Sequence, residues 1–209
     1  MKILNLYAGI GGNRKQWGDK HEITAVEINS EIADIYKSQF PNDNIIVTDA
    51  HQYLIDNYKN YDFIWSSPPC PSHSRSRFWG MNRGYKPIYP DMKLYEEILL
   101  LTHYFKGKWI VENVIPFYKP LINAEKIGRH FYWTNLKLNI KIDVKPMSHI
   151  QNSLKLLEDY IGINVSRHKY NGDKRVLLRN CVEPQIGKAI LNVALKIKKE
   201  VNVEQNKLF

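Results

Sequence analysis

Two short segments of the sequence carry side chains that could catalyse a reaction, and the first ends in a cysteine. In Ser67-Pro68-Pro69-Cys70, two prolines fix the backbone and present the thiol rigidly in a loop beyond a predicted strand. His73, Arg75 and Arg77 follow, and neighbouring cations would lower the pKa of the thiol toward its reactive range. We therefore treat Cys70 as a candidate nucleophile. The alternative is that it is a small hydrophobic residue of the core.

The second segment is Val111-Glu112-Asn113-Val114, which ends another predicted strand. A carboxylate that follows a hydrophobic run is costly to bury unless it is paired or partly protonated. A carboxyl group held in this way can donate a proton near neutral pH. Glu112 is therefore a candidate acid, and the alternative is an ordinary surface glutamate at a strand end.

A glycine-rich turn, Tyr7-Ala8-Gly9-Ile10-Gly11-Gly12, follows the first predicted strand and would let the backbone approach a ligand closely. Its spacing is neither the dinucleotide fingerprint nor a P-loop. Glu27, at the end of the second predicted strand, suits ribose hydroxyls, and Asp49 could reach an adenine amino group. Together they favour a binding site for an adenosyl ligand without a pyrophosphate, such as S-adenosylmethionine. The alternative is that the three features are unrelated turn residues of a generic α/β sheet.

The strands that would position these residues are predicted from hydrophobic runs at residues 2–6, 23–26, 45–47, 61–65 and 109–111. Helical periodicity is visible at residues 30–40 and 91–106. Strands that alternate with helices predict an α/β fold with a mainly parallel sheet, in which ligands bind at the carboxyl ends of the strands. We expect one cleft to be lined by Gly9, Glu27, Asp49, Cys70 and Glu112.

The second half of the chain is less regular. The sequence predicts one or two strands within residues 129–142, a helix at 150–161, a polar basic stretch at 164–175 and a final amphipathic helix at 182–199.

Composition limits the class of protein. The chain has 209 residues, of which 44% are hydrophobic, and this is enough for one globular domain with a real core. No apolar run is long enough to span a membrane, and the first residues are too few and too polar for a signal peptide. Two cysteines give no disulfide framework, so we expect reduced thiols and a cytoplasmic location. A net charge of +9 favours a nucleic-acid partner over a merely solvated lysine face.

The glycine-rich turn, Pro69-Cys70 and Glu112-Asn113-Val114 together resemble the motifs of the DNA cytosine-5 methyltransferase family. Glu27-Ile28 resembles the ribose-binding acid of that family and the adenine-packing residue after it. Residues 129–135 resemble its arginine-bearing motif, and residues 179–184 resemble its final Gly-Asn-x-Val-x-Pro motif. The resemblance runs in family order over roughly residues 3–135 and 175–197.

This resemblance implies a Rossmann-like class I S-adenosylmethionine-dependent methyltransferase fold with a small basic C-terminal recognition segment. Cys70 would add to carbon 6 of a cytosine flipped out of double-stranded DNA, Glu112 would hold and protonate ring nitrogen 3, and Arg129 would contact the base. The cofactor-binding residues that it implies are Tyr7, Gly9, Ile10, Gly11, Gly12, Glu27, Ile28, Asp49, Ala50, Pro69, Leu94, Asn180 and Val182.

Nucleic-acid contacts are expected from two basic segments, the loop after Cys70 and the stretch before the last motif. The candidate contact residues are Ser72, Arg75, Arg77, Arg83, Lys86, Arg167, Lys169 and Lys174. We assign residues 1–135 and 176–199 to the catalytic domain, 136–175 to a reduced target-recognition region and 200–209 to a flexible tail.

The sequence also departs from the family pattern. Pro71 stands where the family has glutamine, and Arg179 stands where it has glycine. The family's two arginines fall opposite Gly128 and His130, with Arg129 between them. Because the recognition region is short, we expect it to recognise a short or relaxed nucleotide sequence, and a partner protein could supply further specificity. We expect the chain to be a monomer. A role in restriction-modification is compatible with a small stand-alone enzyme.

Other interpretations remain open. Cys70-x-x-His73 could be half of a metal site, but Cys181 is not recognisably spaced to complete it, and we expect no metal. Ser67-Pro68-Pro69 resembles the tetrad of amino methyltransferases, although that reading leaves Glu112 unexplained. A cytosine-5 enzyme acting on RNA and a nucleic-acid-binding protein without catalysis are the remaining alternatives. Cys181 is expected to pack beside the cofactor and to be dispensable for the chemistry.

Overall fold

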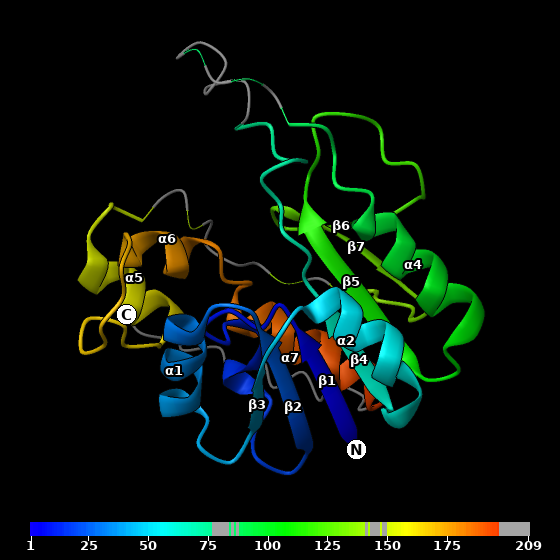
Figure 1. Cartoon of the computed structure of the whole chain (residues 1–209), viewed down its shortest axis with the longest axis horizontal. Coiled ribbons are helices and arrows are strands. Elements are labelled where there is room, and N and C mark those ends of the chain that lie inside the picture. Colours follow the sequence, from blue (N-terminus) through cyan, green and yellow to red (C-terminus); the bar gives the residue numbers. More distant parts are fainter. Residues whose placement is uncertain are drawn as a thin grey trace, which may run out of the picture.

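A central sheet of seven strands organises the molecule, with the strand order β3-β2-β1-β4-β5-β7-β6 (Figure 1). The computed structural model describes residues 1–76, 84, 86, 88–140, 142, 147 and 150–196. Its strands are β1 (Lys2–Leu6), β2 (Glu22–Glu27), β3 (Asn44–Val47), β4 (Phe63–Ser66), β5 (Lys108–Val114), β6 (Glu125–Ile127) and β7 (His130–Thr134). Strands β1 to β5 pair in parallel, and β7 pairs antiparallel with both β5 and β6. The predicted α/β fold with a mainly parallel sheet is confirmed.

Helices connect the strands and cover both faces of the sheet. They are α1 (Ser30–Gln39), α2 (Ala50–Asn57), α4 (Lys93–Tyr104), α5 (Leu154–Ile161), α6 (Lys174–Arg179) and α7 (Pro184–Ala194), with short 3-10 helices η1 (Asn13–Gln16) and η2 (Tyr58–Asn60). The final helix is shorter than predicted, and residues 197–209 lie outside the described part. Strand β6, which the sequence did not predict, has only three residues and little hydrophobic pattern.

Alternating side chains along the parallel strands form two separate cores. On one face, Ile3 and Ile110 pack with Ile190 of α7 in one buried cluster. On the other face, Leu4 and Ile64 pack with α2 and α4. Strands that are buried on both faces are typically near-continuous hydrophobic runs. The parallel strands could therefore be predicted from short apolar stretches of the sequence.

Helices α5 and α6 form a small unit beside α1, and this unit shares a hydrophobic cluster with the rest of the molecule (Figure 1). Leu157 of α5 and Leu178 of α6 belong to a cluster that also contains Ile10 of the glycine-rich turn and Ile35 of α1. The predicted recognition region therefore packs directly on the catalytic part. Its proposed boundaries at residues 135 and 176 stay a prediction.

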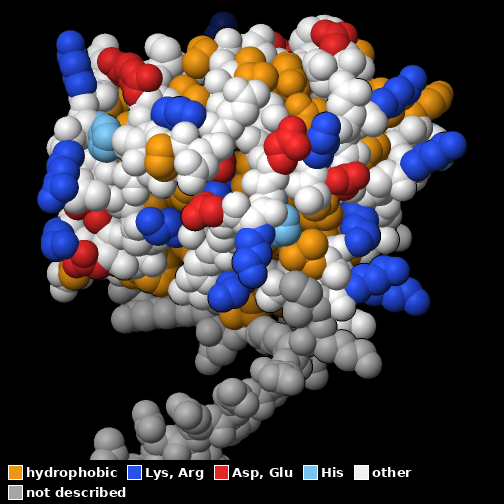
Figure 2. All heavy atoms as spheres, turned by 90° about the horizontal axis from the view of Figure 1, so that it is seen from below, with side chains coloured by type: hydrophobic (Ala, Val, Ile, Leu, Met, Phe, Trp, Pro, Cys, Tyr) orange, Lys and Arg blue, Asp and Glu red, His pale blue; other side chains and the backbone are white. Residues whose placement is uncertain are grey.

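Charge is distributed rather than gathered on the face that Figure 2 shows. Lys and Arg side chains lie there among acidic and hydrophobic ones. This face therefore presents no concentrated basic surface to a nucleic acid.

The backbone of helix α7 packs closely against the backbone of η1, and Gly187 makes this approach possible. A Cβ atom on Gly187 would lie 2.2 Å from the backbone oxygen of Asn13. The indole nitrogen of Trp17 donates a hydrogen bond of 3.1 Å to the carbonyl of Gly187. The last helix is thus fixed against the turn that follows β1.

We predict that Gly187→Ala lowers the free energy of unfolding by about 1–3 kcal/mol, because the clash is with backbone that cannot move aside. Urea denaturation measures this change. The exposed neighbour Lys188 gives the control, since Lys188→Ala on the same helix should change stability by less than about 0.5 kcal/mol. Equal midpoints for the two variants would contradict the packing argument.

Candidate functional site

Four strand ends meet at one edge of the sheet and bring the candidate residues together. In the parallel register, Leu6 of β1 lies beside Val26 of β2 and Ser66 of β4, and Ser66 lies beside Val111 of β5. The glycine-rich turn, Glu27 and the Cys70 loop therefore lie at the same edge of the sheet. Glu112 lies there as well, directly after the last residue of β5 that pairs with β4, although β5 itself continues to Val114. The sequence prediction that these segments share one edge agrees with this register.

The glycine-rich turn is tied to the end of β2 through Glu27. The backbone amide of Gly9 donates to one carboxylate oxygen of Glu27 at 3.0 Å, and the amide of Asn29 donates to the other at 3.0 Å. Gly9 has a φ of +54°, and no atom lies within 4 Å of the place its Cβ would take. The turn thus presents open backbone next to a buried carboxylate.

Two further glycines are required by packing against the protein itself. A Cβ on Gly11 would lie 2.3 Å from the ring of Phe40, and a Cβ on Gly12 would lie 2.5 Å from the Cβ of Cys181. Packing of the protein itself is thus one reason for these two glycines, and their contact with a cofactor stays a prediction. They let the turn pack against the end of α1 and against the segment that links α6 to α7.

The remaining predicted cofactor residues divide by burial. Ile28 is 67% exposed beside Glu27 and is available to an adenine ring, and Asp49, Pro69 and Asn180 are exposed as well. Asp49 caps α2 by accepting from the amide of Gln52 at 2.8 Å, and this hydrogen bond lowers its pKa. By contrast, hydrophobic clusters enclose the side chains of Ile10, Ala50, Leu94 and Val182.

These residues fit an adenosyl group. The Glu27 carboxylate still has lone pairs for ribose hydroxyls, Ile28 offers an apolar surface, and Gly9 leaves space beside them. An uncharged adenosine moiety would find both its polar and its apolar partners here.

Cys70 starts a tight turn, since its carbonyl accepts hydrogen bonds from the amides of His73 at 3.0 Å and Ser74 at 2.9 Å. Its thiol is half-buried, and burial together with the nearby Glu112 carboxylate raises its pKa. The expectation that flanking cations lower this pKa is wrong. Arg129, distant in sequence, is the cation that opposes the rise.

The two flanking residues that the structure describes, His73 and Arg75, do not lower the pKa of the Cys70 thiol, and the reasons differ. His73 is buried, which lowers its pKa and keeps it neutral, and its Nδ1 lies 2.6 Å from the Tyr118 hydroxyl. Arg75 directs its Nε to the carbonyl of Pro116 at 3.4 Å. Arg77 lies outside the described residues. Proximity in sequence was therefore a poor guide to proximity in space.

Glu112 has the property that the sequence predicted for it. Burial raises the pKa of its carboxyl to about 7, against the opposing effects of a hydrogen bond from Ser67 and of the Arg129 charge. Nε2 of His130 lies 3.3 Å from Oε1 of Glu112. Burial lowers the pKa of His130 to about 3, so the imidazole is neutral and does not hold Glu112 in its ionised form.

Ser67 links the nucleophile loop to Glu112, and sequence reasoning did not single it out. Its hydroxyl accepts a hydrogen bond of 2.9 Å from the indole nitrogen of Trp65 and itself bonds to Glu112. The side-chain amide of Asn113 donates to the carbonyl of Pro68 at 2.9 Å. A hydroxyl directly before a Pro-Pro-Cys segment is the signal that could have identified it.

Arg129 lies in the turn between β6 and β7, where Gly128 has a φ of +59°. Its Nε donates to Glu183 at 3.1 Å, and one terminal nitrogen donates to the carbonyls of Arg179 at 2.8 Å and Cys181 at 2.6 Å. Arg129 therefore ties the final motif to the sheet edge. Its contact with a base stays a prediction.

The expected nucleic-acid contacts are spread over two regions. Arg75, Lys86, Arg167 and Lys169 are exposed, whereas Ser72 is buried and accepts from the amide of Asp91 at 3.0 Å. Arg83, like Arg77, lies outside the described residues. Lys174 donates to the carbonyl of Ser166 at 3.0 Å.

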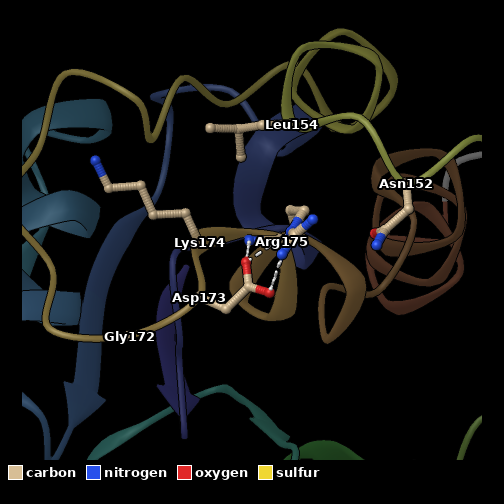
Figure 3. A pocket seen from close by; sticks show the side chains of 6 residues that line it. All are labelled: Asn152, Leu154, Gly172, Asp173, Lys174 and Arg175. Carbon is tan, nitrogen blue, oxygen red and sulfur yellow. Dashed lines mark hydrogen bonds and ion pairs between the residues drawn. The ribbon is translucent and has the colours of Figure 1, made fainter.

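A pocket of about 510 Å³ lies beside α6, in the unit formed by α5 and α6 (Figure 3). Figure 3 shows Arg175 bound to Asp173 within this pocket, and their closest contact is 2.8 Å. The positive charge of Arg175 is thereby balanced locally, and none of the residues that line this pocket is a candidate catalytic residue.

Two negative findings concern the described residues alone. No group of three or more His, Cys, Asp or Glu side chains is placed there to hold a metal ion. Among the helices of that part, none has the length and apolar character needed to cross a membrane.

Comparison with known proteins adds an independent line of evidence. A family model described as C-5 cytosine-specific DNA methylase matches residues 1–121. A tRNA (cytosine(38)-C(5))-methyltransferase of Spodoptera frugiperda is 37% identical over 81 residues, which are 36% of this chain and 24% of that protein. The enzyme of the same name from Mus musculus is 27% identical over 81 residues, covering 36% of this chain and 20% of that protein. The match thus spans about a quarter or less of each relative.

Solved structures are similar only in a general way. A methyltransferase of Entamoeba histolytica has a TM-score of 0.43 at 13% identity and covers 95% of this chain and 99% of its own. A TehB-like S-adenosylmethionine-dependent methyltransferase of Corynebacterium glutamicum has a TM-score of 0.34 at 17% identity, covering 54% of each chain. These likenesses are too weak to support an argument.

The family match spans the central residues of the candidate site. The matched residues 1–121 include the glycine-rich turn, Glu27, Cys70 and Glu112. The prediction of S-adenosylmethionine as the methyl donor is confirmed at the level of the family. Because the family model covers more than half of the chain, this protein belongs to the C-5 cytosine-specific DNA methylase family.

Proposed function

We propose that this protein transfers a methyl group from S-adenosylmethionine to carbon 5 of a cytosine in DNA. The observation that carries the proposal is the pair formed by Cys70 and Glu112 at the ends of adjacent parallel strands. The carboxyl of Glu112 affects the pKa of the Cys70 thiol, and its own pKa is about 7. A nucleophile and an acid that is half-protonated near neutral pH are thus available in one place.

The chain's own residues account for the steps on the base. The Cys70 thiolate forms a bond from sulfur to carbon 6 while protonated Glu112 donates to ring nitrogen 3, so electron density moves to carbon 5. S-adenosylmethionine, when bound, supplies an electrophilic methyl group to carbon 5. A base then removes the carbon 5 proton, the double bond between carbons 5 and 6 re-forms, and the Cys70 thiolate leaves. Glu112 recovers its proton from nitrogen 3.

The two pKa shifts make the reactive form a minor one. Productive attack needs an ionised Cys70 and a protonated Glu112, although the thiol has the higher pKa of the two. Between these pKa values, a rise in pH produces thiolate and removes protonated carboxyl in equal proportion. The reactive fraction is therefore constant over this interval and falls on both sides of it.

Access to the base requires that it leave the duplex, at a cost of a few kcal/mol. We propose that Arg75 and Lys86 of the nucleophile loop bind phosphates near the flipped base. Arg167 and Lys169 of the proposed recognition region, residues 136–175, would bind the backbone further along. All four side chains are exposed, which supports this assignment.

RNA is the second candidate substrate. Both curated relatives are named as tRNA (cytosine(38)-C(5))-methyltransferases, although the match covers only 36% of this chain. The chemistry on the base is the same for either nucleic acid. The two candidates differ only in which polymer the basic residues bind.

The proposal predicts 5-methyldeoxycytidine in the DNA of a host that lacks cytosine methylation and expresses this protein. Nucleoside mass spectrometry of DNA and of tRNA from the same cells makes the measurement. Cys70→Ala should abolish the product, because no other side chain replaces the sulfur nucleophile.

Cys181→Ser is the matched control and should retain substantial activity. Burial raises the pKa of that thiol to about 12, so it is not a nucleophile. Methylated cytosine in tRNA alone would transfer the proposal to RNA. Methylation of an exocyclic amino group, or no methylation from a folded protein, would refute it.

A second prediction concerns pH. For the wild-type protein, kcat/KM should rise with pH and level off near pH 7, where Glu112 begins to lose its proton. Glu112→Gln keeps a neutral polar group at every pH, so its kcat/KM should be about 10²–10⁴-fold lower and should continue to rise above pH 7. Initial rates over about pH 6 to 9 test this. A variant profile that still levels off near pH 7 would assign that ionisation to another group.

The same substitution should change stability in a pH-dependent way. The carboxyl has an ordinary pKa of 4.5 and a folded pKa of about 7, so the folded state favours its protonated form. Below the ordinary pKa the carboxyl is protonated in both states, so its burial costs no stability. As the pH rises through 7, the free energy of unfolding of the wild type falls by up to about 3 kcal/mol. The Tm of Glu112→Gln should therefore equal that of the wild type near pH 4.5 and exceed it at pH 8. Equal Tm values at both pH values would contradict the burial argument.

A further inference from the structure

Glu97 of α4 is a buried carboxylate that the proposed mechanism does not use. It is 1% exposed and lies beneath the edge of the sheet where the site is built. Its Oε1 accepts from the Tyr7 hydroxyl at 2.6 Å, and its Oε2 accepts from the Ser66 hydroxyl at 2.5 Å. Nδ1 of His51 on α2 lies 3.1 Å from Oε1.

Two of the residues that bind Glu97 lie next to the segments on which the proposed mechanism depends. Tyr7 opens the glycine-rich turn, and Ser66 ends β4 directly before Ser67-Pro68-Pro69-Cys70. A carboxylate without such partners would be costly at this depth, and hydrogen bonds to an ionised acceptor are stronger than neutral ones. One side chain therefore joins the cofactor turn to the nucleophile loop.

The backbone at Tyr7 shows that this contact bears on the geometry of the turn. Tyr7 has a φ of +53°, in the left-handed region that residues other than glycine rarely adopt. Such a conformation costs of order 1–3 kcal/mol and persists only where the surroundings hold it. The hydrogen bond to Glu97 holds the side chain of Tyr7, and the amide of Ala8 donates to the carbonyl of Val26 at 3.0 Å.

We propose that Glu97 is a positioning residue that couples occupancy of the glycine-rich turn to the placement of Cys70. A ligand that reorients Tyr7 alters the hydrogen bond to Oε1 of Glu97. The Glu97 side chain then shifts, and its hydrogen bond from Ser66 to Oε2 changes as well. Coupling between two sites is reciprocal, so Cys70 and the ligand affect each other to the same extent. The inference rests on the proposed function only in taking an adenosyl compound as the ligand of the turn.

Glu96 provides a matched control at the preceding position of the same helix. Its side chain is 61% exposed, and its Oε2 lies 3.4 Å from Nε2 of His51. Glu96→Gln and Glu97→Gln make the same chemical change, remove the same charge and keep nearly the same volume. They differ in burial and in the contact with the two loops.

The test uses S-adenosylhomocysteine and iodoacetamide on the full chain. Calorimetry measures ligand binding, and peptide mass spectrometry measures the rate of Cys70 alkylation with and without ligand. We expect the ligand to change the alkylation rate several-fold in the wild type and in Glu96→Gln. In Glu97→Gln we expect at least about tenfold weaker binding of S-adenosylhomocysteine, because charge-assisted hydrogen bonds are lost. We also expect an altered rate of Cys70 alkylation in the free protein. The ratio of the alkylation rates with and without ligand should be near one.

Cys181 reports folding within the same digests, because it is buried and unreactive in the native chain. If Cys181 stays protected and Glu97→Gln shows the wild-type ratio and affinity, the proposal is overturned. If Cys181 becomes reactive, Tyr7→Phe and Ser66→Ala replace that variant, since each removes one arm of the link. Wild-type ratios in both would then overturn it.

The outcome for the wild type separates this inference from the proposed function. Ligand binding that leaves the Cys70 alkylation rate unchanged overturns the coupling and leaves methyl transfer intact. No binding of S-adenosylhomocysteine at all rejects the adenosyl site and the coupling together.

Discussion

The carboxyl group of Glu112 lies at the end of β5, enclosed by the edge of the sheet, where water has little access to it. Burial raises its pKa to about 7 and also acts on its neighbours, since it keeps His130 neutral and raises the pKa of the Cys70 thiol. A more exposed Glu112 would be fully ionised at neutral pH and would hold nitrogen 3 of a base poorly. The same burial costs stability, which is a common feature of catalytic sites.

Much of this arrangement follows from the sequence because parallel strands end at one edge of a sheet. Short hydrophobic runs located the strands, and residues that follow these runs, such as Cys70 and Glu112, were expected to lie close together. The electrostatics of Cys70 could not be obtained in this way. The direction of a loop side chain depends on tertiary contacts, and Arg75 and His73 both bind elsewhere.

Polar residues inside regular elements were harder to recognise. The helix at residues 91–106 was identified by its apolar period, and this period hides Glu97, whose burial depends on hydroxyls that lie far away in the sequence. The glycine-rich turn misled in the opposite direction. Gly11 and Gly12 are needed for contacts with Phe40 and Cys181, so a motif that indicates a ligand also reflects how tightly the turn is packed.

The size of the segment before the last motif has a physical consequence. A unit of some tens of residues rarely buries enough surface to fold alone. Here α5 and α6 share a hydrophobic cluster with Ile10 and Ile35, and two polar contacts extend the same interface. His168 meets Ser38 at 3.1 Å, and the amide of Asn171 donates to Glu31 at 2.9 Å. If this unit binds a nucleic acid as proposed, a shift of the unit would act directly on α1 and on the glycine-rich turn, which it contacts.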